Sequence, residues 1–144
     1  MNYKELLDTE RSCPFCDFGK NRIITKMGVA QLTYSLAPYC ENHLLVTPKR
    51  HIESFEDLTE EEKKDIDSML SKGIKFLKTL GHTDYSILLR NGNKTGKTVA
   101  HLHYHIIPSI QVGSLDNNDI KRELITEEEI DKLLESFEKV EANL

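Results

Sequence analysis

The amino-acid sequence predicts an α+β domain in which helices lie outside an antiparallel sheet. Short apolar segments rich in β-branched and aromatic residues, bounded by glycine and proline, predict strands. Two longer segments carry apolar residues mostly at spacings of three and four, which is typical of helices with one buried face. The chain has 144 residues, and we expect residues 1–144 to form a single domain.

Two pairs of strands are expected to lie side by side in the sheet. Gly28 divides two apolar segments and predicts the turn of a hairpin. Pro48 ends the third segment, and a glycine-containing loop over 92–96 joins the last two, which are expected to pair with each other. The expected strands cover residues 22–27, 29–36, 43–47, 85–90 and 99–107.

Two threonines mark the starts of the expected helices. Thr59 and Glu62, and again Thr126 and Glu129, have the spacing of a capping box, in which the two residues satisfy each other's free amides. Gly81 is expected to end the first helix. The apolar residues expected to face the core are Ile66, Met69, Leu70, Ile74, Phe76, Leu77 and Leu80, then Ile130, Leu133, Leu134, Phe137 and Val140.

Composition and charge argue against a protein that binds nucleic acids or membranes. Hydrophobic residues make up 38% of the chain, charged residues 30%, and the formal net charge is −5. No apolar run is long enough for a membrane span and the first residues do not resemble a signal peptide, so we expect a cytoplasmic protein. The pair Cys13 and Cys16 indicates metal or redox chemistry in a reducing compartment, while Cys40 is expected to be a small apolar residue.

Three of the six histidines alternate with apolar residues in the last expected strand, at His101, His103 and His105. Side chains at alternate positions of a strand share one face, whereas a helix would scatter the three rings. At about 3.3 Å per residue the outer two Cα atoms are about 13 Å apart, so one metal ion cannot take all three rings. One or two rings could bind a metal. A row of buried histidines bonded only to backbone is the alternative.

The loop before this strand looks like a nucleotide P-loop, but it differs in two respects. Between Gly92 and Gly96 there is one residue too few, and the loop leads into a strand instead of a helix. Phosphate binding remains expected, through backbone amides and Thr98.

These segments resemble the signature of the histidine triad (HIT) family of nucleotide hydrolases and transferases. In that family His-φ-His-φ-His-φ-φ, where φ is apolar, follows a glycine-containing loop. The upstream segment His43-Leu-Leu-Val-Thr-Pro-Lys-Arg-His-Ile52 also matches. The resemblance covers about 13–108 and leaves 109–144 as a C-terminal loop and helix. It implies a twisted antiparallel sheet with a long helix and a C-terminal helix packed outside, usually extended across a homodimer.

The resemblance also implies catalytic roles. The central histidine, His103, attacks the α-phosphate of a purine nucleotide to form a covalent nucleotidyl-imidazole. Its other ring N–H should be held by a backbone carbonyl. His105 donates to the phosphate oxygens, and Thr98 bonds the phosphate or the leaving group. His43 supports the site, and Gly96 belongs to the phosphate-binding loop.

Several bacterial HIT proteins and the related hexose-phosphate uridylyltransferases bind structural zinc. The matching ligands here are Cys13, Cys16, His51 and His101. The site would be closed, and would therefore support the fold. Redox chemistry at the cysteine pair is the alternative, which the lack of a surrounding βαβ pattern disfavours. A metal oxidase that uses two of the strand histidines lacks an obvious carboxylate ligand.

The chain departs from the family pattern at four positions. Arg90 stands where relatives usually carry a carboxamide, Lys97 where they carry glutamine, and Ser109 where many carry arginine. Ser35 replaces the residue that binds the ribose hydroxyls in many members. The two cations are either ordinary solvated charges or ligands for a more highly charged phosphate group.

We therefore expect a hydrolase that cleaves the bond between a nucleoside monophosphate and a leaving group, which is an amine, a phosphate, a nucleotide or a sulfate. One alternative is a nucleotidyltransferase or phosphorylase of dinucleoside polyphosphates. A different class is a nucleotide-binding module with little catalysis.

Overall fold

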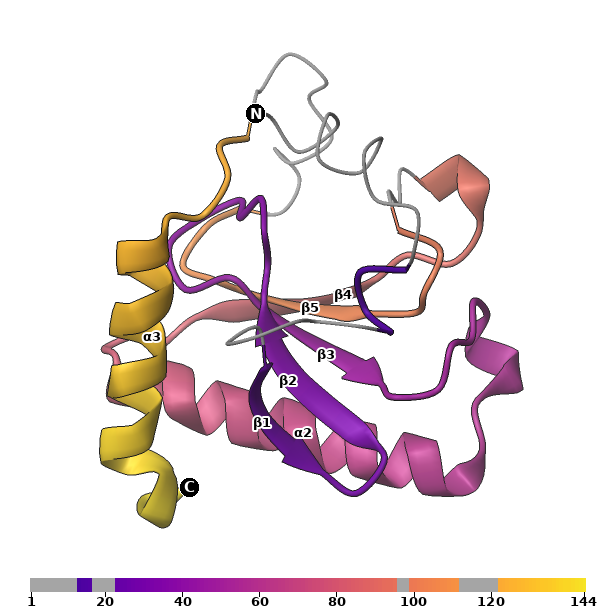
Figure 1. The fold of residues 1–144 in the computed structure, drawn as a ribbon, viewed down its shortest axis with the longest axis horizontal. Coiled ribbons are helices and arrows are strands. Elements are labelled where there is room, and N and C mark those ends of the chain that lie inside the picture. Colours follow the sequence, from indigo (N-terminus) through magenta and orange to yellow (C-terminus); the bar gives the residue numbers. More distant parts are fainter. Residues whose placement is uncertain (1–12, 17–22, 96–98, 112–121) are drawn as a thin grey trace.

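A computed structural model of the chain describes residues 13–16, 23–95, 99–111 and 122–144. Three residues of the expected phosphate loop, Gly96, Lys97 and Thr98, lie outside the described residues. The α+β class is confirmed, with one sheet and helices packed outside it (Figure 1). No helix in the described part of the chain is both long and apolar enough to cross a lipid bilayer.

The sheet has five strands in the order β1-β2-β3-β5-β4, and each neighbouring pair is antiparallel. The predicted hairpin is present, and its turn is at Gly28, whose φ of 55° suits glycine. Strand β4 lies at one edge and pairs with β5, as the sequence predicts. The strands are β1 (Ile23–Met27), β2 (Ala30–Tyr34), β3 (Leu44–Pro48), β4 (Tyr85–Leu89) and β5 (Tyr104–Pro108).

The histidine-bearing strand is shorter than predicted. The sequence predicts a strand over 99–107, but β5 begins only at Tyr104, so two of the three histidines precede it. The neighbouring strand β3 ends at Pro48, which has no N–H to extend the ladder. The amide of Leu102 instead donates to the carbonyl of Ile52 at 2.8 Å. The chain therefore leaves the sheet just before β5.

Helix α2 (Glu60–Thr79) runs across one face of the sheet (Figure 1). The predicted capping box is complete, because Thr59 Oγ1 accepts from the Glu62 amide and the Glu62 carboxylate accepts from the Thr59 amide. After the helix, Gly81 adopts φ 94° and its amide donates to the Lys78 carbonyl. Gly81 thus ends α2 as predicted.

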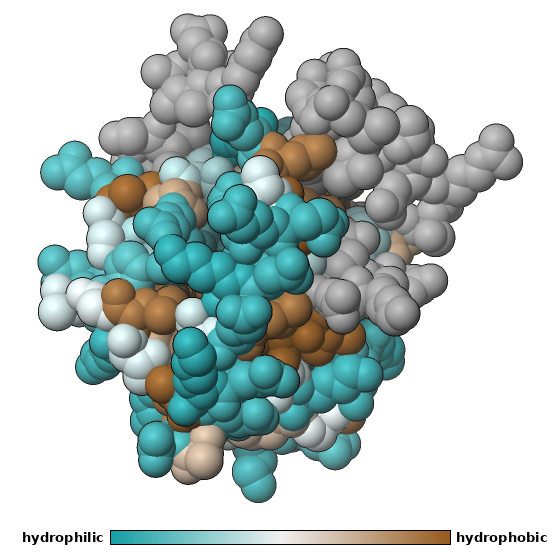
Figure 2. Space-filling model, turned by 60° about the vertical axis from the view of Figure 1, so that its left-hand side comes forward, coloured by the Kyte–Doolittle hydropathy of each residue, from teal (hydrophilic) through white to brown (hydrophobic). Residues whose placement is uncertain are grey.

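Helix α3 (Glu127–Val140) packs beside the sheet (Figure 1). Thr126 caps it through the Glu129 amide, but its hydroxyl also donates to the Glu129 carboxylate, so this cap is not the reciprocal box predicted. The rings of Phe76 and Phe137 join α2 to α3, 5.2 Å apart and nearly perpendicular. On the side where α3 lies, hydrophilic residues cover most of the described surface (Figure 2). Short 3₁₀ helices cover Phe55–Asp57, Asn93–Thr95 and Glu141–Asn143.

The two faces of the sheet have different roles. The face toward α2 and α3 forms the main core, which includes Leu102 and Ile106. Because successive side chains point to opposite faces, the three histidines lie on the other face, as the sequence predicts. This holds also for His101 and His103, which precede the regular strand. On that face Phe15 packs with Leu45 and Val99. The fold therefore places the N-terminal cysteine segment over the histidine side of the sheet.

Candidate functional site

The ring of His103, the predicted nucleophile, is oriented by a hydrogen bond to the backbone. Its Nδ1–H donates to the carbonyl of His101 at 2.8 Å. A neutral imidazole carries one proton, so Nε2 then holds a lone pair. This is the backbone bond expected for a nucleophilic histidine.

His105 and His43 form a hydrogen-bonded pair on the same side of the sheet. The amide of Tyr39 lies 3.2 Å from His43 Nδ1, and His43 Nε2 lies 2.9 Å from His105 Nδ1. A backbone amide can only donate, so His43 carries its proton on Nε2 and donates it to His105. Neutral His105 therefore carries its proton on Nε2. It can donate to a bound anion, as its predicted role requires.

Burial keeps this pair neutral. It lowers the pKa of His43 to about 3, and the nearby charge of Arg122 contributes next. Burial likewise lowers the pKa of His105 to about 2, and the nearby charge of His103 is the next largest cause. The hydrogen-bond directions above therefore hold at neutral pH.

A group of residues around Tyr39 borders the histidine pair. The Tyr39 ring stacks on His43 at 5.4 Å, and the guanidinium of Arg122 lies 4.2 Å from the centre of the Tyr39 ring. Arg90 donates to the Tyr39 hydroxyl at 3.1 Å. Arg90 thus lies beside Tyr39, near the histidine pair. Sequence reasoning missed Arg122, because nothing in its local pattern shows that it returns to Tyr39.

Ser35 and the phosphate loop are the remaining predicted substrate contacts. Ser35 is buried, and its amide donates to the carbonyl of His43 at 3.1 Å, so it lies beside the histidine pair. Of the loop the structure describes Gly92, whose φ of 98° suits glycine. Residues Asn93–Thr95 follow as a 3₁₀ turn, in which the Thr95 amide and hydroxyl both donate to the Gly92 carbonyl. Gly96, Lys97 and Thr98 are the loop residues that lie outside the described part of the chain.

The four predicted metal ligands come together in space. The candidate ligand atoms of Cys13, Cys16, His51 and His101 all lie within 4.8 Å of one another. Cys16 Sγ is 3.2 Å from His51 Nδ1 and 3.5 Å from His101 Nδ1. Bonds of about 2.0–2.3 Å to a tetrahedral zinc give ligand separations of about 3.3–3.8 Å. Two thiols and two imidazoles are also a donor set that zinc prefers, so the residues fit this metal.

Neighbouring groups orient two of these ligands. His101 Nε2–H donates to the carbonyl of Pro48 at 2.8 Å, which leaves Nδ1 free to face the cysteines. Arg50, next to His51, forms two hydrogen bonds to the buried carboxylate of Glu62, at 2.7 and 3.2 Å. The first turn of α2 therefore anchors the segment that carries His51.

Phe15, between the two cysteines in sequence, contacts two histidines of the row. Its ring centre is 5.9 Å from that of His101 and 4.9 Å from that of His103, edge to face in both cases. The cysteine turn thus packs directly against the predicted nucleophile.

A search of protein families matches the HIT domain to residues 20–112. The chain belongs to the HIT domain family. An uncharacterized HIT-like protein of Methanocaldococcus jannaschii is 32% identical over 120 residues, which are 75% of this chain and 92% of the relative. An adenosine 5′-monophosphoramidase of Schizosaccharomyces pombe is 32% identical over 101 residues, 67% of this chain and 74% of the relative. The resemblance stated from the sequence is confirmed.

Solved HIT structures share the fold. A Plasmodium falciparum diadenosine triphosphate hydrolase superposes with a TM-score of 0.72 at 22% identity, covering 86% of this chain and 79% of that one. A zinc-bound histidine triad family protein from Mycobacterium smegmatis gives 0.66 at 21% identity, covering 92% and 98%. Both likenesses confirm the HIT-like sheet with its helices.

Proposed function

We propose that this protein hydrolyses the bond between the α-phosphate of a purine nucleotide and a leaving group, through a covalent nucleotidyl–His103 intermediate. The observation that carries the proposal is the bond from His103 Nδ1–H to the His101 carbonyl, because it places the lone pair of the neutral ring on Nε2. Relatives named for adenosine substrates support the choice of nucleotide.

The reaction has two balanced steps. In the first, the His103 Nε2 lone pair forms a bond to the α-phosphorus while the bond from phosphorus to the leaving group breaks. The leaving group takes the electron pair of that bond and then a proton from solvent. In the second, the oxygen of water bonds to the same phosphorus while the phosphorus–Nε2 bond breaks and returns its electron pair to His103. The proton that water loses passes to solvent, and the nucleoside monophosphate is released. The Nε2–H of His105 donates to the phosphate oxygens as their charge grows. The Tyr39 amide donates to His43, and His43 donates to His105 Nδ1; we call these two hydrogen bonds the relay. The relay keeps the proton of His105 on Nε2.

A second candidate is a phosphorylase or transferase of dinucleoside polyphosphates, in which phosphate replaces water in the second step. An AP-4-A phosphorylase of Mycobacterium tuberculosis is 28% identical over 88 residues, 60% of this chain and 45% of the relative. Arg90 and Arg122 beside Tyr39 favour a substrate with further phosphate groups. Thr98, Gly96 and Lys97 are proposed to bind those phosphates.

We propose a structural zinc ion held by Cys13, Cys16, His51 and His101. The close approach of the four donor atoms and their chemistry support it, and a HIT structure from Mycobacterium smegmatis is described as zinc-bound. A zinc with four protein ligands supplies folding free energy. Here the ligands would tie the cysteine turn to the segment before β5.

A homodimer in a reducing cytoplasm completes the proposal. Strand β4 lies at the sheet edge and leaves Tyr85 and Ile87 nearly half exposed, which favours pairing with a second copy. The cysteines of the described residues are free thiols, in keeping with a reducing compartment.

Intact-mass analysis tests the nucleophile. Mixed with an activated adenosine monophosphate donor, the protein should gain the mass of one nucleotidyl group, located at His103. His103→Ala should form no adduct and lose several orders of magnitude in kcat, with nucleotide binding within about tenfold, because it removes covalent catalysis and few ground-state contacts. As the matched control, His105→Ala should still form the adduct, about 10²–10³-fold more slowly. Tight nucleotide binding with neither adduct nor turnover would instead favour a binding module.

A further inference from the structure

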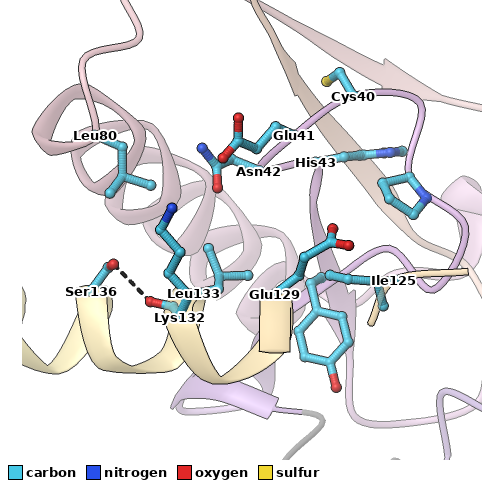
Figure 3. Close-up of a pocket in the computed structure, with 12 residues that line it drawn as sticks. Cys40, Glu41, Asn42, His43, Leu80, Ile125, Glu129, Lys132, Leu133 and Ser136 are labelled. Carbon is cyan, nitrogen blue, oxygen red and sulfur yellow. Dashed lines mark hydrogen bonds between the residues drawn. The ribbon is translucent and has the colours of Figure 1, made fainter. Parts of the chain in front are cut away.

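The turn that ends at His43, residues 39–43, borders a cavity on one side. Figure 3 shows this turn along one edge of the cavity, with Leu80 at the end of α2, and Lys132 and Ser136 of α3 across from it. The cavity has a volume of about 250 Å³. On this side the turn borders open space, so hydrogen bonds to neighbouring segments contribute to holding its position.

The turn contains a strained residue next to the histidine. Asn42 has φ 64°, and Ser109, just after β5, has φ 61°. Among the residues that the structure describes, these are the two other than glycine with positive φ. Asparagine tolerates this conformation better than most residues and serine less well, so both need support from their surroundings.

One imidazole links these two residues. The Asn42 Nδ2–H donates to His82 Nε2 at 2.9 Å, and His82 Nδ1 lies 2.7 Å from Ser109 Oγ. Because the amide nitrogen only donates, neutral His82 carries its proton on Nδ1 and donates it to the serine. We call these three side chains the Asn42–His82–Ser109 clamp. Its serine stands where many HIT proteins carry arginine.

The clamp rests on a rigid support. The amide of His82 donates to the Leu77 carbonyl, which completes the hydrogen-bonded stop at the end of α2. A second bond runs in parallel, from the Cys40 thiol to the Pro108 carbonyl at 3.3 Å. Both connections tie the 39–43 turn to the end of β5, the strand that carries His105.

This arrangement sets the geometry of the histidine pair. The turn carries both Tyr39, whose amide orients His43, and His43 itself, whose Nε2 must meet His105 Nδ1. A shift of the turn relative to β5 would therefore break the relay. We propose that His82, although it does not belong to the histidine row, is a positioning residue that holds His43 in register with His105 through Asn42. The inference rests on the proposed function, because the register matters for reaction only if His105 donates to substrate.

Three variants test the clamp through turnover. His82→Ala removes the imidazole, and Asn42→Gly removes the side chain while glycine keeps the positive φ without cost. Misplacement by about 1 Å can cost about 10²-fold in rate, so we expect each variant to lose about tenfold or more in kcat, with KM within about twofold. The double variant should lose no more than either single one, because all three break the same connection. Thr83→Ala, an exposed neighbour of His82, is the matched control and should retain wild-type kcat.

Ring nitrogen NMR of the free protein gives a readout that needs no turnover. In the wild type, His105 should show a single tautomer with unprotonated Nδ1; in His82→Ala and Asn42→Gly this signal should shift toward a tautomer average. Unchanged His105 signals in both variants would overturn the proposal. If the wild type is active, the proposal also fails if His82→Ala keeps the wild-type kcat, or if the kcat loss of the double variant equals the product of the two single losses. If the wild type has no nucleotide turnover, the function fails separately, and the ring signals alone decide whether the clamp positions the pair.

Discussion

Lowering the pH from 7 to 5 is expected to destabilise this fold through two neighbouring histidines. The ordinary histidine pKa of 6.5 falls to about 3 at His43 and about 2 at His105, chiefly because both rings are buried. Below pH 6.5 each ring binds a proton in the unfolded chain but remains neutral in the fold. The unfolded state then holds more protons, so the free energy of unfolding decreases as the pH falls toward the folded pKa values.

The size of the effect follows from the pKa differences. One pKa unit corresponds to about 1.4 kcal/mol, so the interval from pH 6.5 to pH 5 costs about 2 kcal/mol for each ring. His43 and His105 together would remove about 4 kcal/mol. A domain of this size has a total stability of about 5–15 kcal/mol, so the loss should be plain in any unfolding measurement.

Urea unfolding at pH 7 and pH 5 provides the assay, on wild type and on His105→Asn with matched metal content. The variant keeps every proposed zinc ligand, so the acid sensitivity of the metal site cancels in the comparison. The loss of unfolding free energy between the two pH values should be smaller in the variant by about 2 kcal/mol. Thr83→Ala should show the full wild-type loss. Equal losses in wild type and His105→Asn would refute the assignment of buried neutral rings.

Two further predictions concern the metal and the cations. Purified protein should contain about one zinc per chain, and the double variant Cys13→Ser with Cys16→Ser should contain none. Chelation should lower the Tm, because a structural metal contributes folding free energy. Protein prepared without chelator that contains no zinc would contradict the zinc proposal. Arg90 and Lys97 should favour polyphosphorylated nucleotides over phosphoramidates, since a charge pair about 4 Å apart is worth up to about 4 kcal/mol at an effective dielectric of 20. Arg90→Asn with Lys97→Gln should then reverse the ratio of kcat/KM between the two substrate classes, and an unmoved ratio would mark them as surface charges.

Local patterns were sufficient to predict most elements of the fold. The capping residues Thr59 and Glu62, the stop at Gly81 and the alternation of the three histidines are short-range features. The carbonyl that orients His103 is likewise two residues away in the sequence. Such features are readable because the atoms that decide them lie within one turn or one strand.

The proposed metal ligands came from the ordered combination of motifs and the family resemblance, because spacing alone does not pair them. The contact between β3 and β5 was not predicted from the sequence. His101 and Cys13 are 88 residues apart, yet their ligand atoms lie 3.5 Å from each other. The resemblance could pair them because the C-x-x-C segment and the Pro-Lys-Arg-His element occur in the order known from the family.

Tertiary packing alone decided the surroundings of the histidine pair. Arg122 reaches Tyr39 from the C-terminal segment, and His82 joins Asn42 to Ser109 from the end of α2. These partners are polar residues in turns, where neither period nor capping pattern constrains the sequence. Their pairing depends on how α2 and β5 end in space, because a hydrogen bond needs its two atoms within about 3 Å whatever their separation along the chain. The same is true of the start of β5, which is set by the missing amide of Pro48 on the neighbouring strand.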